Sequence, residues 1–244
     1  MSKRIATFEF LQACRAARTA DEIGGLLQQA LAQCGVAYVA CASHVDPLKP
    51  PRGAVMMVNY PQAWLAHFSD SGFAHVDPIY WAAGWMPREF WWDKFFAAME
   101  LTREQKRVLN EARECGIAGG MTIPIHSPGA LPASCSVVPG PDGVDPLDIP
   151  DIQFMAINAH EEARLRNGGA LTAPPILSKR QRECMALAAM GKSDSVIGQI
   201  LGISPRTVEH TIEDVRKKFG VSHRTQAVAL SVVSRLVSLN ELSD

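Results

Sequence analysis

The sequence predicts an α+β protein in two parts: an N-terminal α-β-α sandwich with an antiparallel sheet, and a C-terminal all-α domain of four helices. Before residue 167, short apolar runs bounded by Gly, Pro or Ser alternate irregularly with amphipathic runs, a pattern typical of helices packed on an antiparallel sheet. After residue 176, apolar side chains recur only at helical intervals. Between these parts, residues 167–176 contain two glycines and two prolines and predict a flexible linker. We therefore expect domains at residues 1–166 and 177–244.

The first part opens with a predicted helix followed by a strand. Thr19 and Glu22 have the spacing of a capping box, and the amphipathic run that they open ends near Gly35. Small and β-branched residues then predict a strand at Val36–Ser43. Similar short apolar runs predict strands at Ala54–Asn59, Met121–His126 and Ala133–Val138. Helical periodicity predicts helices at Pro61–Phe68, Thr102–Glu114 and Pro150–Arg166.

The second part is expected to hold helices at Ser178–Met190, Ser193–Leu201, Ser204–Phe219 and His223–Leu239. A serine at three of these starts can accept hydrogen bonds from the free backbone N–H groups of the first turn. Gly202 can take the left-handed conformation that ends a helix, and Pro205 suits the first position of the next one. This order of helix, tight glycine turn and helix predicts a helix-turn-helix.

Charge differs between the two parts, although the whole chain has a net charge of −1. Residues 171–244 carry ten basic and seven acidic side chains, and the remainder carries 14 basic and 18 acidic ones. A basic module joined to an acidic one is typical of a DNA reader with a separate sensing domain.

The composition argues against several other classes of protein. Charged residues interrupt every candidate signal peptide, and no segment reaches the ~18 uncharged apolar residues of a membrane helix. We therefore expect a cytoplasmic protein that has no membrane partner. The six cysteines are scattered, with no CxxC pair and no His at ligand spacing, so we expect buried thiols and neither a metal nor a cofactor.

The second helix of the helix-turn-helix has an apolar face and a polar face. The apolar face, which includes Val208 and Ile212, must pack on the first helix, so the polar face can enter the major groove of DNA. There Arg reads guanine and a carboxylate accepts from cytosine. The residues expected at base edges are Arg206, Glu209, His210 and Glu213, with Thr207 at the same end of the helix. The candidates for phosphate contacts are Lys179, Arg182, Lys192, Lys217, Lys218 and Arg224. The alternative is a solvated helical hairpin that binds no DNA.

Across its whole length, this part resembles the DNA-binding domain of LuxR-type transcriptional regulators. The resemblance is carried by Leu177–Met185, Gly191–Ser193, Ile197, Leu201–Ser204, Arg206–Val208, His210, Lys218, Gly220–Ser222 and Arg224–Ala227. Two positions depart from the family, which usually has Glu where this chain has Gln181 and Leu where it has Met185. Met for Leu is a tolerable core exchange, but Gln181 removes a charge and can alter a polar contact.

The first part contains residues that suit a small-molecule pocket. Tyr60 and Trp64 are four residues apart and would point the same way from one helix. Their O–H and N–H donors could converge with Asp77 as an acceptor, since small ligands are held in mostly apolar cavities by a few polar groups. Core packing is the alternative for each aromatic residue, and helix capping is the alternative for Asp77 before Pro78.

Residues 30–165 resemble the autoinducer-binding domain of quorum-sensing LuxR regulators, whose ligands are N-acyl-homoserine lactones. The matching segments are Asn59–Pro61, Trp64, His75–Pro78, Trp92–Asp93, Ala112–Glu114, Gly116–Ile117, Gly120–Ile125 and Ser136. The resemblance implies that Trp64 donates to the lactone carbonyl, that Asp77 accepts from the amide N–H and that Tyr60 donates to the acyl carbonyl. It places Ser136 near the same amide, and Trp92 over the ring with its neighbour Trp91 as the alternative.

The acyl tail is expected among Met56, Leu65, Phe68, Val108, Leu109 and Ile117. Phe68 stands where the family often has Tyr, which makes that wall drier. Because Met and aromatic side chains are bulky, the sequence favours a short, branched or aryl acyl group over a long chain.

The function expected from both resemblances is that of a ligand-responsive transcription factor and not of an enzyme. Lactone binding would stabilise the first domain and permit a homodimer to read a pseudo-palindromic site, with RNA polymerase as a further partner. The apolar stripe Val228, Val232, Leu236 and Leu239 could serve the dimer contact. One alternative is a receptor for a non-lactone ligand. Another is a lactone-processing enzyme with Asp77 or His75 as base, although no nucleophile beside a His supports it. Activator and repressor both remain open.

Overall fold

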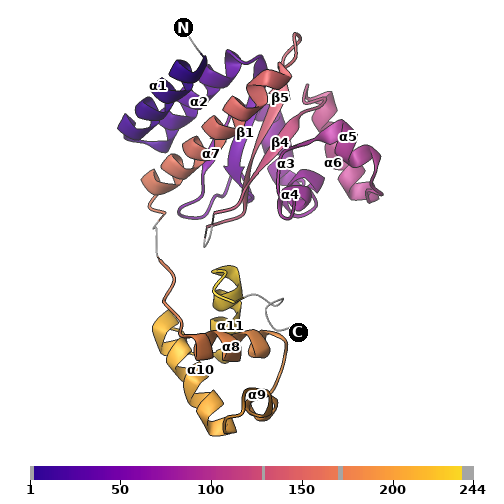
Figure 1. The fold of residues 1–244 in the computed structure, drawn as a ribbon. Coiled ribbons are helices and arrows are strands. Elements are labelled where there is room, and N and C mark those ends of the chain that lie inside the picture. Colours follow the sequence, from indigo (N-terminus) through magenta and orange to yellow (C-terminus); the bar gives the residue numbers. More distant parts are fainter. Residues whose placement is uncertain (1–2, 128–129, 170–172, 238–244) are drawn as a thin grey trace. The chain divides into compact units, whose positions relative to one another are not determined.

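The computed structural model describes residues 3–127, 130–169 and 173–237, which divide into two compact units, Met1–Ala170 and Leu171–Asp244 (Figure 1). The first unit is built around a sheet, and the second consists of helices. The predicted α+β class is confirmed, with an α-β-α sandwich in the first unit.

The described part of the first unit contains a five-stranded sheet with the strand order β2-β1-β5-β4-β3, and every neighbouring pair is antiparallel. The strands are β1 (Val36–Ser43), β2 (Met56–Val58), β3 (Phe90–Trp91), β4 (Met121–Ile125) and β5 (Ala133–Pro139). The four predicted strands are confirmed, and β1 has the predicted bounds. The two-residue strand β3 was not predicted, because so short a pairing leaves no alternating pattern.

Helices α1 (Lys3–Ala16), α2 (Ala20–Ala32) and α7 (Ile149–Arg166) cover one face of the sheet (Figure 1). Their apolar side chains and alternate residues of the strands form one core, in which Ile23, Leu27 and Leu31 are fully buried. Thr19 caps α2 as predicted, but the Glu22 carboxylate accepts from the N–H of Arg18. The helix α1 was not predicted.

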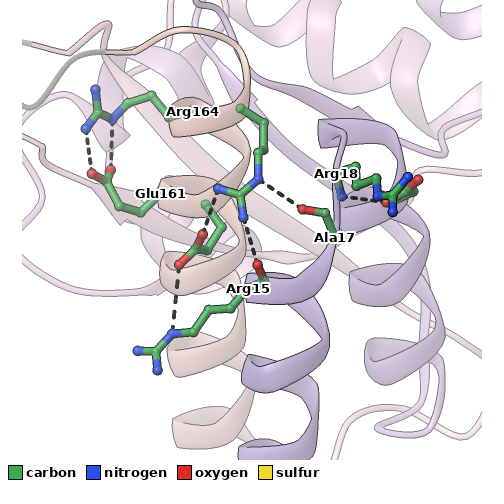
Figure 2. A network of polar contacts seen from close by, with 8 residues as sticks. Arg15, Ala17, Arg18, Glu161 and Arg164 are labelled. Carbon is green, nitrogen blue, oxygen red and sulfur yellow. Dashed lines mark hydrogen bonds and ion pairs between the residues drawn. The ribbon is translucent and has the colours of Figure 1, made fainter.

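Side-chain hydrogen bonds join the end of α7 to the end of α1 (Figure 2). Arg166 donates from Nε to the carbonyl of Ala17 at 3.0 Å and from Nη2 to the carbonyl of Arg15 at 2.9 Å. These are carbonyls that a helix C-terminus leaves without an intrahelical partner. Glu161 and Arg164 pair on the side of α7 away from Arg15. These hydrogen bonds therefore hold the C-terminal ends of α1 and α7 together on this face of the sheet.

Shorter helices cover the other face of the sheet. These are α3 (Gln62–Asp70), the 3-10 helix η1 (Phe73–His75), α4 (Pro78–Ala83), α5 (Trp92–Ala97) and α6 (Arg103–Glu114). A further 3-10 turn, η2 (Pro146–Asp148), precedes α7. Side chains of α3 to α6 form a second core that is rich in aromatic rings. One expectation is wrong here: Tyr60 does not share a helix with Trp64, because Pro61, with ψ 133°, precedes the first helical residue.

Within residues 173–237 the second unit has the four predicted helices, α8 (Lys179–Ala189), α9 (Asp194–Leu201), α10 (Pro205–Phe219) and α11 (Arg224–Val233). Ser178, Ser193 and Ser204 cap the first three as predicted. Gly202 ends α9 at φ 65°, which confirms the left-handed glycine turn.

The last helix is shorter than predicted. It ends at Val233, and Arg235 has a positive φ of 55°, so Leu236 lies beyond the helix and packs on the core of this unit. The expected apolar stripe therefore does not continue along the helix from Val228 and Val232. Leu239 lies outside the described residues.

Candidate functional site

A cavity of about 530 Å³ lies on the side of the sheet that is covered by α3 to α6. Its lining includes every residue that the sequence assigned to the ligand. These are Met56, Tyr60, Trp64, Leu65, Phe68, Asp77, Trp92, Val108, Leu109, Ile117 and Ser136. Residues far apart in the sequence are thus brought around one mostly apolar space, which has the size and character of small-ligand sites.

Asp77 caps a helix and also lines the cavity. Its Oδ1 accepts from the N–H of Ile79 at 2.7 Å, so the side chain caps α4, and the residue also lines the cavity. Burial raises the pKa of the carboxyl to about 7, while backbone hydrogen bonds from Ile79 and Tyr80 act in the opposite direction. Burial and the neighbouring Asp77 also raise the pKa of Tyr60, which keeps its O–H available as a donor.

A chain of hydrogen bonds holds Trp92 against the floor of the cavity. Its indole Nε1 donates to Thr122 Oγ1 at 2.8 Å, and Thr122 Oγ1 lies 2.8 Å from Ser136 Oγ. Gly120 leaves room for the ring, because a Cβ there would lie 2.9 Å from the indole and 2.7 Å from the carbonyl of Val137. Trp92 lines the cavity, whereas Trp91 packs against the core on the opposite face of the sheet.

The floor of the cavity is formed by small side chains from the central strands. Ala40 lies opposite Ser136 in the antiparallel register, and Ala42 lies opposite Ser134. Alternation along a strand places these four residues on one face. Ser134 was not predicted, although its spacing of two residues from Ser136 was a usable signal.

Tyr80 and Thr122 were missed as site residues as well, Tyr80 because it has no local sequence signal and Thr122 although it lies in the matching segment Gly120–Ile125. Tyr80 lines the cavity from α4, and Thr122 reaches Ser136 only through the pairing of β4 with β5. Four exposed side chains that are charged or polar also line the cavity, namely Asp93, Lys106, Asn110 and Arg113.

The residues predicted at base edges gather on one surface of the second unit. Arg206, Glu209, His210 and Glu213 of α10 line a hollow together with Asp194 and Pro205. Thr207 is exposed at the same end of α10, where its Oγ1 lies 2.8 Å from Ser204 Oγ. The Glu213 pKa is lowered by its hydrogen bond to Lys217, so the carboxylate is ionised and can accept.

The candidates for phosphate contacts fall into two groups. Lys179 and Lys192 are exposed, Lys179 with only a 4.0 Å approach to Glu183. The other four side chains already have partners within the unit. To bind phosphate, each would have to leave its partner or contact both groups at once. Arg182 donates to the carbonyl of Leu177, Lys217 pairs with Glu213, Lys218 donates to Ile176 and Gln181, and Arg224 pairs with Asp194.

The described part of the chain contains neither a cluster of metal-binding side chains nor a membrane-spanning helix. No group of three or more His, Cys, Asp or Glu side chains could hold a metal ion there. No helix in residues 3–127, 130–169 or 173–237 is long and apolar enough to cross a membrane.

A sheet-and-helix unit with a ligand-sized cavity, in one chain with a helix-turn-helix, defines a ligand-regulated DNA-binding protein. Residues 19–163 match the autoinducer binding domain family, and residues 175–231 match the bacterial regulatory proteins of the luxR family. The chain belongs to the autoinducer-binding LuxR-type transcriptional regulators of quorum sensing. Members of this family are transcriptional regulators and not enzymes.

Several named proteins are similar to the chain over most of its length. It is 29% identical to the transcriptional activator protein EchR of Dickeya chrysanthemi, over 78% of this chain and 81% of that protein. It is 28% identical to the quorum-sensing regulator RhlR of Pseudomonas aeruginosa, over 87% and 88% of the two chains. Identity to the transcriptional activator protein LuxR of Aliivibrio fischeri is 25%, over 74% of each.

Solved structures support the fold. The crystal structure of Escherichia coli SdiA is 22% identical, with a TM-score of 0.59 over 96% of this chain and 99% of that one. SdiA in complex with octanoyl-rac-glycerol has a TM-score of 0.58 at 22% identity, over 96% of both chains.

Proposed function

We propose that residues 1–166 bind an N-acyl-homoserine lactone and thereby control DNA binding by residues 177–244, with residues 167–176 as the linker. The observation that carries the proposal is that all the side chains assigned to the ligand from the sequence line one cavity. Its polar groups suit an amide and a lactone, and its apolar walls suit an acyl chain.

The proposed roles follow the chemistry of each side chain. Trp64 donates to the lactone carbonyl, Tyr60 donates to the acyl carbonyl, and Asp77 accepts from the amide N–H. Ser136 contacts the same amide, and Trp92 closes the cavity over the lactone ring. The burial of Trp64, Asp77, Trp92 and Ser136 supports these roles, because a hydrogen bond to a ligand in a dry site meets little competition from water.

The acyl group is proposed to lie among Met56, Leu65, Phe68, Val108, Leu109 and Ile117. The aromatic core around the cavity supports a short, branched or aryl group, since Phe68, Phe73 and Trp64 are in mutual ring contact.

DNA recognition is proposed to use Arg206, Glu209, His210 and Glu213 at base edges, with Thr207 as a further DNA-binding residue at the same end of α10. Lys179, Arg182, Lys192, Lys217, Lys218 and Arg224 are the proposed phosphate contacts. A homodimer would place two copies of α10 on a pseudo-palindromic site in the cytoplasm, with RNA polymerase as a further partner. Leu230, Val232 and Val233 of α11 are exposed apolar side chains that support a contact between copies.

The test is a DNA mobility-shift assay on the purified full chain, with and without a panel of acyl-homoserine lactones. We expect one class of lactone to change the affinity for DNA. Asp77→Asn and Trp64→Phe should each reduce the affinity for that lactone about tenfold or more. His75→Ala is the control, because His75 is exposed and does not line the cavity.

Three outcomes contradict parts of the proposal. If every lactone leaves both DNA binding and thermal stability unchanged, the ligand is of another class. If the lactone is returned with its ring opened, the protein is a hydrolase and not a receptor. If Asp77→Asn binds the ligand as the parent does, the amide contact is wrongly assigned.

A further inference from the structure

The cavity has a second polar region that the proposed lactone contacts do not use. Ser134 lines the cavity and is only 3% exposed, and its Oγ lies 2.9 Å from Nε2 of His44. The His44 ring stacks on Tyr80, with centroids 4.2 Å apart and planes 12° from parallel. Tyr80 also lines the cavity. His44 therefore contacts two cavity-lining side chains that carry hydroxyl groups, Ser134 and Tyr80.

The His44 ring and the Tyr80 phenol are both uncharged at pH 7. Burial, followed by the charges of His160 and His126, lowers the pKa of His44 to about 4, so the ring is neutral at pH 7. A neutral imidazole nitrogen either donates or accepts a hydrogen bond, and the Ser134 hydroxyl can act as the acceptor or as the donor accordingly. Burial and then Asp77 and Asp46 raise the pKa of Tyr80, which keeps its phenol protonated.

The distance between the two polar regions can be derived from the strand. Ser134 and Ser136 are two residues apart on β5 and share a face, so their side chains are about 6.7 Å apart. Ala42 lies opposite Ser134 in the register and Met56 lies opposite Ala42, so the neighbours of Ser134 on β1 and β2 are apolar, whereas His44 and Tyr80 supply the polar groups of this region. A chain gains about 1.3 Å per bond when extended, so this separation corresponds to five or six bonds.

We propose that this region binds a hydroxyl group on the acyl part of the ligand, five or six bonds beyond the amide nitrogen. Ser134 and Tyr80 are the proposed partners, and His44 acts as a positioning residue behind them. The inference rests on the proposed function, because it takes the ligand amide to lie beside Ser136. A hydroxyl suits the region since it both donates and accepts, whereas a carboxylate would be buried next to Asp77 and repelled.

The experiment compares matched ligands on the purified full chain by calorimetric titration. One pair is N-(4-hydroxybenzoyl)-homoserine lactone and N-benzoyl-homoserine lactone, and the other is the 5-hydroxypentanoyl and pentanoyl compounds. We expect the hydroxylated member of at least one pair to bind about tenfold more tightly, the effect of one buried hydrogen bond. Ser134→Ala and Tyr80→Phe should each reduce this preference towards equality.

The control is Leu65→Ala, which should weaken both members of a pair and leave their ratio unchanged, because Leu65 lines the cavity without a hydroxyl. Equal affinity of both members in the parent would overturn the inference and leave lactone binding intact. A preference that survives in both Ser134→Ala and Tyr80→Phe would overturn the assigned residues. If no homoserine lactone binds, the proposed function fails and the inference fails with it.

Discussion

The indole N–H of Trp92 donates to Thr122 Oγ1 across 2.8 Å, at a position where the Thr122 side chain is completely buried. The same oxygen lies 2.8 Å from Ser136 Oγ. Thr122 thus joins a ring on the wall of the cavity to a hydroxyl on its floor. The packing of the wall and the orientation of the polar group on the floor therefore depend on one side chain.

Thr122→Val should destabilise the first unit and weaken ligand binding. The valine fills a similar volume but leaves a buried indole N–H without its acceptor, which costs about 1–3 kcal/mol. All five tryptophans lie in the first unit, so urea unfolding followed by tryptophan fluorescence reports on that unit alone. Thr122→Ser retains the hydroxyl and is the control. Equal stability of the valine and serine variants would contradict the prediction.

His160 should make the first unit sensitive to acid. It is 1% exposed, and neither ring nitrogen has a hydrogen-bond partner among the described residues. Burial lowers its pKa to about 4, with Glu161 opposing the shift and Arg164 adding to it. Because the unfolded value is near 6.5, its contribution to stability is present above that pH and is lost as the pH falls from 6.5 through 4.

The measurement is the difference in unfolding free energy between the parent and His160→Phe, at several pH values from 7 to 4.5. The phenyl ring removes two unsatisfied nitrogens, so we expect the variant to be more stable at pH 7 and its advantage to grow on acidification. The parent and the variant must be compared at each pH because Asp77, whose pKa is raised, makes both proteins more stable as the pH falls. Taking the difference between the two proteins removes this shared effect. A constant difference over this range would show that His160 does not carry the effect.

Sequence patterns predicted most of the long elements, with the 14-residue helix α1 as the exception, and missed several short ones. Val36–Ser43 forms β1 as expected, because eight apolar and small residues follow Gly35 without a competing helical period. By contrast, Pro78–Ala83 and Trp92–Ala97 form helices of six residues, too short to establish a periodicity. Tertiary contacts between aromatic rings fix this region, and such contacts cannot be read from local spacing.

The candidate site shows the same division. Trp64 and Asp77 were found because the family motifs contain them, and Ser136 for the same reason. Thr122 required the register of β4 with β5, which places it opposite Ser136, whereas Ser134 could have been inferred from its spacing to Ser136 on one strand. Strand alternation identifies each face but does not state which strands are neighbours.

Gln181→Glu should stabilise the second unit. The substitution introduces the residue that the family usually has at this position. Gln181 Oε1 accepts from the N–H of Ser178 at 3.0 Å and from Lys218 Nζ at 2.8 Å. A carboxylate would keep both contacts and pair with the lysine, which for an exposed pair contributes up to about 1 kcal/mol. Hydrogen exchange of the α8 and α10 amides measures the effect.

Gln199→Glu is the control for Gln181→Glu, because it makes the same change of charge at an exposed position on α9. The stabilisation by Gln181→Glu should decrease at high salt and disappear in a Lys218→Met background. If Gln199→Glu slows exchange to the same extent, the effect comes from net charge and not from the contact with Lys218.

Arg206→Ala and Lys192→Ala should weaken DNA binding in different ways. Arg206 lies with Glu209 and His210 around the hollow on α10, so its loss should cost about 1–3 kcal/mol and relax the preference for one base pair. Lys192 is exposed and precedes α9. Its loss should weaken binding to all DNA sequences equally and reduce the slope of log affinity against log salt concentration by about one. Competition binding with a randomised site, repeated at two salt concentrations, separates the two effects. If Arg206→Ala keeps the base preferences of the parent and changes only the salt dependence, Arg206 contacts phosphate, and the base-edge role falls to the acidic and imidazole side chains beside it.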